Sequence, residues 1–109
     1  MIDACIIMTT CGSEESAMKI AAALVDRRLA ACVTMIPGTK SYYHFEGSTH
    51  LDEEIKMLIK TSAGHFEEAS KLIAELHPYQ VPEILMIKAD AASAPYLKWM
   101  EDCVGKDGG

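Results

Sequence analysis

The feature that most constrains the fold is an apolar run over residues 2–10, which ends at the turn-forming Cys11-Gly12-Ser13. A run of this length and composition is typical of a strand buried on both faces, so the rest of the chain must cover it. Ser13 is a suitable N-cap, and acidic residues follow it in the first turn, where the helix dipole favours negative charge. Apolar side chains then recur at helical spacing, which predicts a helix over residues 14–28 closed by two arginines.

The next part of the chain predicts a long antiparallel hairpin. Residues 29–36 have strand character, and Pro37-Gly38 marks a turn or a bend. The aromatic-rich residues 41–45 are again strand-like, residues 47–49 form a second turn, and residues 54–60 alternate as in a strand. Together these segments predict a hairpin whose first arm is bent.

The remaining elements are a helix, a strand and a final helix. The second helix is expected over residues 63–77, ended by Pro78, and an apolar core strand over residues 84–87. Residues 94–104 predict a short helix with an inward face of Tyr96, Trp99, Met100 and Cys103. This order predicts an α+β, ferredoxin-like βαββαβ sandwich with a long bent hairpin and an extra C-terminal helix. We expect one domain over residues 1–104 and a flexible tail over residues 105–109.

Charge and hydropathy limit the class of function. The formal net charge of −6 argues against nucleic acid as a partner, because phosphate binding needs a basic surface. No apolar stretch reaches the roughly 18 to 20 residues of a membrane span, and the acidic N-terminus is unlike a secretory signal. The four cysteines contain no C-x-x-C pair and are expected to be reduced thiols. A cytoplasmic location is therefore expected.

Several segments share a pattern with one family of small proteins. The segment from His77 to Ile84, HPYQVPEI, resembles the His-Pro-Tyr-Glu/Gln-x-Pro-Glu-Ile/Leu sequence of the CutA family almost without departure. Phe45 stands where that family usually has tryptophan. The other similar segments are Arg28-Leu29-Ala30-Ala31-Cys32-Val33, Pro37-Gly38 with Ser41, Tyr43, Phe45 and Gly47, Lys60-Thr61, and Tyr96-Leu97 with Trp99. The resemblance implies a protein of divalent-cation tolerance whose ferredoxin-like protomers form a homotrimer through their sheet edges.

The residues supply a separate reason to expect self-association. A long hairpin on so small a domain would expose unpaired strand edges and the rings of Tyr42, Tyr43 and Phe45. A ring of protomers would cover these edges, as closed symmetry allows. The alternative is a monomer in which the aromatic rings simply cover the sheet.

His77 has a structural and a functional interpretation. It can cap the second helix, or it can bind a metal, because histidine is a common ligand of copper, zinc and nickel. The resemblance implies copper or another divalent metal bound by this histidine and by a cysteine at the end of the first strand. Thr9 occupies the position of that cysteine, and Cys11 lies two residues beyond it. We therefore take His77, Cys11 and Glu83 as candidate metal ligands.

The two prolines of the same segment predict a stiff loop that can hold Tyr79 and Glu83 in fixed positions. With Lys60, these residues are the candidates for a small-ligand site. Glu83 can equally form an ion pair with a lysine or arginine of a neighbouring chain, and Lys60 is one possible partner. The resemblance also extends to the trimeric PII regulators, so a ligand-sensing trimer or a non-catalytic scaffold remains an alternative function. An enzyme is not expected: Ser41 and Ser62 have no evident base and carboxylate in the sequence, and the glycines form no phosphate loop.

Overall fold

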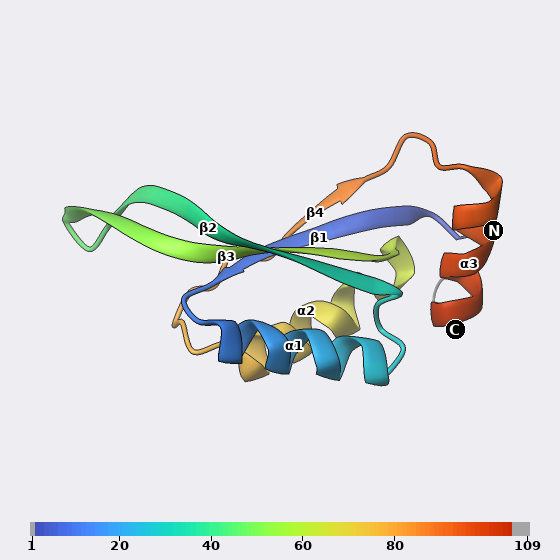
Figure 1. The fold of residues 1–109 in the computed structure, drawn as a ribbon, viewed down its shortest axis with the longest axis horizontal. Helices are drawn as coiled ribbons and strands as arrows, with labels where there is room; N and C mark the ends of the chain where they lie inside the picture. Colours follow the sequence, from blue (N-terminus) through green and yellow to red (C-terminus); the bar gives the residue numbers. More distant parts are fainter. Residues whose placement is uncertain (1, 106–109) are drawn as a thin grey trace.

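A computed structural model describes residues 2–105 of the chain and contains one antiparallel sheet with helices on one face and at one end (Figure 1). The sheet has the strand order β2-β3-β1-β4. The ferredoxin-like α+β architecture predicted from the sequence, with its extra C-terminal helix, is confirmed. Of the predicted tail, residues 106–109 lie outside the described residues. The elements are β1 (Ala4–Cys11), α1 (Glu14–Asp26), β2 (Cys32–Phe45), β3 (Ser48–Ser62), the 3-10 turn Ala63–His65, α2 (Phe66–Leu76), β4 (Leu85–Lys88) and α3 (Ala94–Val104).

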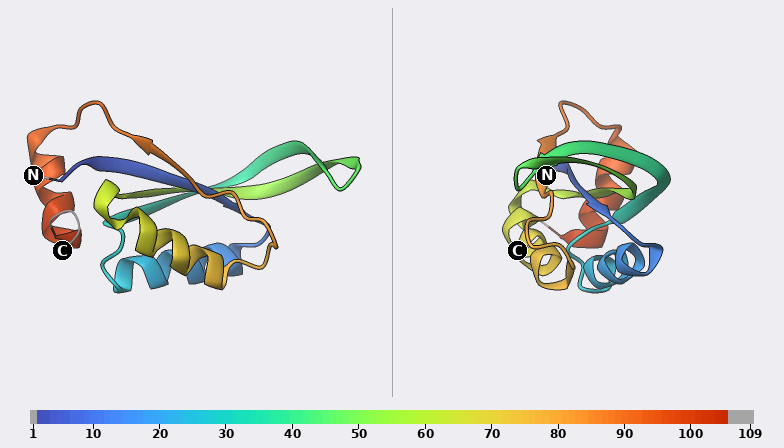
Figure 2. Two further views of the ribbon diagram at one scale, coloured as in Figure 1. Left: turned by 180° about the vertical axis from the view of Figure 1, so that it is seen from behind. Right: turned by 90° about the vertical axis from the view of Figure 1, so that its left-hand side faces the viewer.

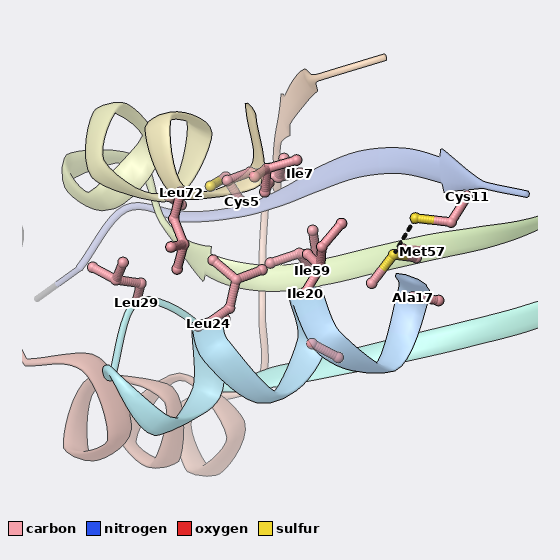
Figure 3. Close-up of a cluster of buried hydrophobic side chains, with 14 residues drawn as sticks. Cys5, Ile7, Cys11, Ala17, Ile20, Leu24, Leu29, Met57, Ile59 and Leu72 are labelled. Carbon is pink, nitrogen blue, oxygen red and sulfur yellow. Dashed lines mark hydrogen bonds between the residues drawn. The ribbon is translucent and has the colours of Figure 1, made fainter. Parts of the chain in front are cut away.

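The core lies between the sheet and the two helices α1 and α2, which pack side by side on the same face (Figures 1 and 2). β1 pairs with β3 on one side and with β4 on the other, so the apolar run predicted as a buried strand is internal to the sheet. As predicted, Ser13 caps α1, and its hydroxyl accepts a hydrogen bond from the backbone N–H of Ser16 at 3.1 Å. Figure 3 shows the apolar side chains that meet between β1, β3 and α1.

The hairpin of β2 and β3 extends beyond the helix-covered part of the sheet, and the molecule is accordingly elongated, 45 Å by 25 Å by 22 Å (Figure 1). The bend predicted in its first arm is present as an irregularity between Ile36 and Thr39, where Gly38 has a φ of 75°. The second turn lies at Glu46 and Gly47, slightly before the predicted position, and both residues have positive φ.

Two predictions about packing hold only in part. β4 was expected to be a core strand, and Met86 does pack against the core, but the strand lies at the sheet edge and Leu85 and Ile87 are each 56% exposed. In α3, Met100 is buried as expected, whereas the rings of Tyr96 and Trp99 lie exposed and pack against each other. Apolar character identified these segments correctly as strand and helix. It does not specify which of their side chains are buried against the core of the same chain.

Arg28 also differs from its predicted role. Helix α1 ends at Asp26, and Arg28 follows it with a φ of 60°. Its guanidinium donates to the carbonyl oxygens of Cys103 at 2.8 Å and Asp102 at 2.7 Å. Arg28 therefore satisfies the free carbonyls at the C-terminus of α3 rather than closing its own helix.

Candidate functional site

The candidate site is built around residues 77–84, which connect α2 to β4 without regular structure. Helix α2 stops at Leu76, and His77 follows in an extended conformation, with φ −76° and ψ 133°. Proline disfavours the helical conformation in the residue before it, so Pro78 explains this change of direction. The turn carries the His77 side chain toward the end of β1.

His77 is buried, and both of its ring nitrogens have partners. Nδ1 accepts a hydrogen bond from the backbone N–H of Tyr79 at 3.1 Å, so it carries no proton. Nε2 lies 2.7 Å from the carbonyl oxygen of Thr10 and donates to it. These contacts define a neutral imidazole that ties the loop after α2 to the last residues of β1.

Cys11 is the last residue of β1, and its side chain is fully buried rather than placed in a turn. Its sulfur lies 3.6 Å from His77 Nε2 and 3.6 Å from the Met57 sulfur, the contact drawn as a dashed line in Figure 3. Burial, and secondarily the negative charge of Glu54, raises the pKa of the Cys11 thiol, so the thiol is protonated at neutral pH. We call Cys11, Met57 and His77 the soft-donor cluster.

Thr9 lies beside this cluster. It pairs with Met57 across the β1–β3 ladder and is fully buried. Within the described residues its hydroxyl oxygen has no hydrogen-bond partner. An unsatisfied buried hydroxyl is uncommon, because leaving a polar group unpaired away from water destabilises the fold.

Tyr79 connects the soft-donor cluster to a more open region. Its ring packs against the His77 ring with centroids 4.6 Å apart, and its hydroxyl donates to Glu54 at 2.6 Å. Partial burial, the hydrogen bond to Glu54 and the charge of that carboxylate all raise the Tyr79 pKa. The close approach also explains Gly12, because a Cβ there would lie 3.1 Å from the Tyr79 hydroxyl.

Tyr79 also lines a cavity of about 390 Å³. Alternate residues of the hairpin strands line it, since side chains two residues apart share a face of a strand. We call this cavity the acidic pocket. Its lining residues are Thr10, Ser41, Tyr43, Phe45, Asp52, Glu54, Tyr79, Gln80, Val81 and Glu83.

Each carboxylate of the acidic pocket has a defined partner. The Tyr43 hydroxyl donates to Asp52, which raises the Tyr43 pKa, and Tyr79 donates to Glu54. Glu83 forms an ion pair with Lys56 at 2.8 Å. The pocket therefore contains both hydroxyl-bonded and ion-paired carboxylates.

The candidate residues chosen from the sequence fall into separate places. His77 and Cys11 lie together, but Glu83 lines the acidic pocket and pairs with Lys56 rather than Lys60. Lys60 instead contacts Cys32 and Thr34 on the neighbouring strand. No group of three His, Cys, Asp or Glu side chains within residues 2–105 is arranged to hold a metal ion.

Met57, Asp52 and Glu54 belong to these sites but are not among the candidates that the sequence indicates. Their positions follow from the strand register, which places Met57 opposite Thr9 and Asp52 opposite Ser41. The β1–β3 ladder ends at the pair Cys11 and Ile55. The β3 residues that precede Ile55 therefore have no β1 partner, and their carboxylates are free to contact the loop after α2.

Comparisons with known proteins agree on one family. The family model described as CutA1 divalent ion tolerance protein matches residues 5–103. A divalent-cation tolerance protein CutA from Thermus thermophilus is 39% identical over 100 residues, covering 92% of this chain and 97% of that protein. The crystal structure of CutA from Xylella fastidiosa superposes with a TM-score of 0.91 at 38% identity, covering 94% of this chain and 98% of that one.

Proposed function

Because the chain belongs to the CutA family of divalent-ion tolerance proteins, we propose that it acts in metal tolerance as a non-catalytic homotrimer that binds copper weakly. The observation that carries the metal part is the soft-donor cluster, in which the Cys11 sulfur is 3.6 Å from both Met57 and His77. Thiolate, thioether and imidazole are donors that suit Cu(I), the soft form of copper.

The donor set fits a copper ion, and the same contacts explain why binding would be weak. The Cys11 thiol must lose its proton, and burial opposes this. Before His77 Nε2 can coordinate, its proton must move to Nδ1, which breaks the hydrogen bond to Thr10 and the one from the Tyr79 N–H. The Thr9 hydroxyl, which has no hydrogen-bond partner within residues 2–105, adds a polar atom beside the cluster.

A competition titration with a chromophoric Cu(I) chelator under reducing conditions tests the metal site. We expect Cys11→Ser and Met57→Leu each to weaken Cu(I) binding, the former by at least about 100-fold, because a thiolate ligand is lost. Cys32→Ser is the matched control, since Cys32 lies next to Lys60, away from the cluster. Unchanged affinity in Cys11→Ser would show that the soft-donor cluster is not the Cu(I) site.

The homotrimer is supported by the two free edges of the sheet. β2 and β4 are different edges, and each leaves apolar side chains in solvent: Tyr42 is 73% and Leu85 56% exposed. Contact between two different surfaces of successive protomers is heterologous and closes into a ring when the rotation permits. We propose three protomers for this ring, which is the number that the family resemblance implies.

Sedimentation equilibrium tests this assembly. We expect a particle of three 11.9 kDa chains, and we expect Ile87→Lys on β4 to dissociate it, because a charge at an apolar contact must be desolvated. Val25→Lys places the same charge on the exposed side of α1 and should leave the trimer intact. A wild-type monomer at micromolar concentration would exclude the assembly.

We further propose that the protein works in the cytoplasm. All four cysteines are free thiols, a state maintained in reducing compartments. Within residues 2–105 no helix has the length and apolar character needed to cross a membrane. Fractionation of cells that express the tagged chain tests the location, and recovery in an exported fraction would contradict it. A structural relative from Archaeoglobus fulgidus, with a TM-score of 0.90 and 32% identity, is described as periplasmic.

A further inference from the structure

The acidic pocket has a surplus of negative charge. Three carboxylates line it, from Asp52, Glu54 and Glu83, and Glu83 is paired with a cation, Lys56. Within the described part of the chain, no lysine or arginine forms an ion pair with Asp52 or Glu54. A cavity lined by one sign of charge concentrates ligands of the opposite sign.

Glu54 is the least solvated of these carboxylates. Its residue is only 5% exposed, yet the donor to its carboxylate within residues 2–105 is a single tyrosine hydroxyl, that of Tyr79. An ionised carboxylate can accept about four hydrogen bonds, and a buried charge without a counter-charge is costly. Because Glu54 lines the cavity, a cationic ligand there would donate further hydrogen bonds to its carboxylate and balance its charge.

The walls of the pocket distinguish an organic cation from a metal ion. The rings of Tyr43, Phe45 and Tyr79 and the side chain of Val81 line the cavity. Hard metal ions need several oxygen ligands at short distance, and no three carboxylates of the described residues are so arranged. Aromatic faces beside carboxylates favour a cation that carries hydrocarbon, through cation–π attraction and apolar contact.

We propose that the acidic pocket binds a primary aliphatic amine in its ammonium form, with Glu54 as the main counter-charge and the tyrosine and phenylalanine rings as the wall. The three N–H donors of an ammonium group match carboxylates that have spare acceptor capacity. A cavity of about 390 Å³ falls in the range of small-molecule sites. The pocket shares no side chain with the soft-donor cluster, so this site does not depend on copper binding.

Calorimetric titration of the assembled protein with 1,4-diaminobutane at low ionic strength tests the site. We expect saturable binding with a dissociation constant of about 1 mM or tighter. The neutral isostere 1,4-butanediol should give no binding, and magnesium chloride at matched ionic strength should compete no better than sodium chloride. Absence of saturable binding by the diamine, or equal binding of the diol, would overturn the proposal.

Variants locate the binding in the pocket. Glu54→Gln keeps the shape of the side chain and should weaken diamine binding at least about tenfold, because the counter-charge is lost. Glu67→Gln removes the same charge from an exposed position on α2 and should change the affinity less than about twofold. If Glu54→Gln does not fold, Val81→Trp provides a second test, since Val81 is 72% exposed and a larger side chain would fill the cavity. Equal losses in Glu67→Gln and Glu54→Gln, or full binding by Val81→Trp, would assign the binding to general charge attraction and contradict the proposal.

Discussion

The soft-donor cluster and the acidic pocket are neighbours that share contact with Tyr79, yet their chemistry is opposite. In the cluster, Cys11, Met57 and His77 are buried in the core and carry no net charge. In the pocket, Glu54 and the remaining carboxylates line an open cavity. A single loop, residues 77–83, supplies His77 to the cluster and Tyr79, Gln80, Val81 and Glu83 to the pocket.

The difference shows how one stiff loop can serve two environments. His77 points toward the end of β1 because its ring nitrogens are fixed by Thr10 and Tyr79. Glu83 lies at the other end of the loop, where Lys56 holds it. Burial favours neutral and polarisable groups in the soft-donor cluster, and access to water allows several charges in the acidic pocket.

The largest predicted effect concerns His77 in the metal-free protein. His77→Ala should lower the free energy of unfolding by about 2–4 kcal/mol, because the ring is buried and its loss leaves the Thr10 carbonyl and the Tyr79 N–H without partners. Urea unfolding of the apoprotein measures this, with His44→Ala, at an exposed position on the hairpin, as the control. A loss below about 1 kcal/mol would mean that the ring does little for the fold.

The next prediction uses pH to separate the cluster from the pocket. The pKa of Cys11 is raised above the ordinary 9.0, so its thiol stays protonated across neutral pH and must release its proton when copper binds. Cu(I) affinity should therefore rise about tenfold per pH unit between pH 6 and pH 8. Chelator competition at several pH values gives the slope, and Cys11→Ser should abolish it. A flat profile in the wild type would show that Cys11 is not a ligand.

Much of the fold could be predicted because each main element has its own sequence signal. The apolar run of β1, the cap at Ser13 and the bend at Pro37-Gly38 are local features, and the structure contains them. The exposure of Leu85 and Ile87 was not predictable, because an apolar run on an edge strand looks the same as one in the core. Only the arrangement of the other elements decides which is which.

The site was harder to predict because it depends on contacts between distant residues. Cys11 and His77 are 66 positions apart and meet only because the ends of β1 and α2 converge. Within the chain, Glu83 pairs with Lys56, whereas the sequence had offered Lys60 of a neighbouring chain as one possible partner. Lys56 and Lys60 share a face of β3, and four residues of strand span about 13 Å, too far for one carboxylate to reach both. No sequence pattern specifies that register.

A smaller effect on stability is expected at Tyr79, whose ring contacts His77 and which also lines the acidic pocket. Tyr79→Phe removes the hydrogen bond to Glu54 and should lower the free energy of unfolding by about 1–2 kcal/mol at neutral pH. The raised Tyr79 pKa means that the folded state holds this proton more tightly than the unfolded state does. The corresponding stability is present below the ordinary value of 10.0 and is lost as the pH rises above it toward the folded-state pKa.

Urea unfolding at pH 7 and again between pH 10 and pH 11 measures both parts of this prediction. The wild type should lose stability more steeply than Tyr79→Phe across the alkaline range. Tyr42→Phe is the matched control, since Tyr42 is exposed and should behave as the wild type in both respects. Equal losses of stability at alkaline pH in the wild type and in Tyr79→Phe would show that the contact with Glu54 does not raise the pKa of Tyr79.

The smallest predicted change in stability is at the ion pair on the rim of the pocket. The side chains of Lys56 and Glu83 are 26% and 32% exposed, so solvent screens the pair, and Lys56→Met should alter the free energy of unfolding by less than about 1 kcal/mol. The same substitution should strengthen the binding of a cationic ligand in the pocket. Removing the lysine frees Glu83 and removes a repulsive charge, so 1,4-diaminobutane should bind about threefold to tenfold more tightly. Lys98→Met, which breaks the ion pair of α3 with Asp102, is the control for both measurements. Weaker diamine binding in Lys56→Met would mean that the lysine, rather than the carboxylates, determines what the pocket binds. The contrast drawn between the pocket and the soft-donor cluster would then be wrong.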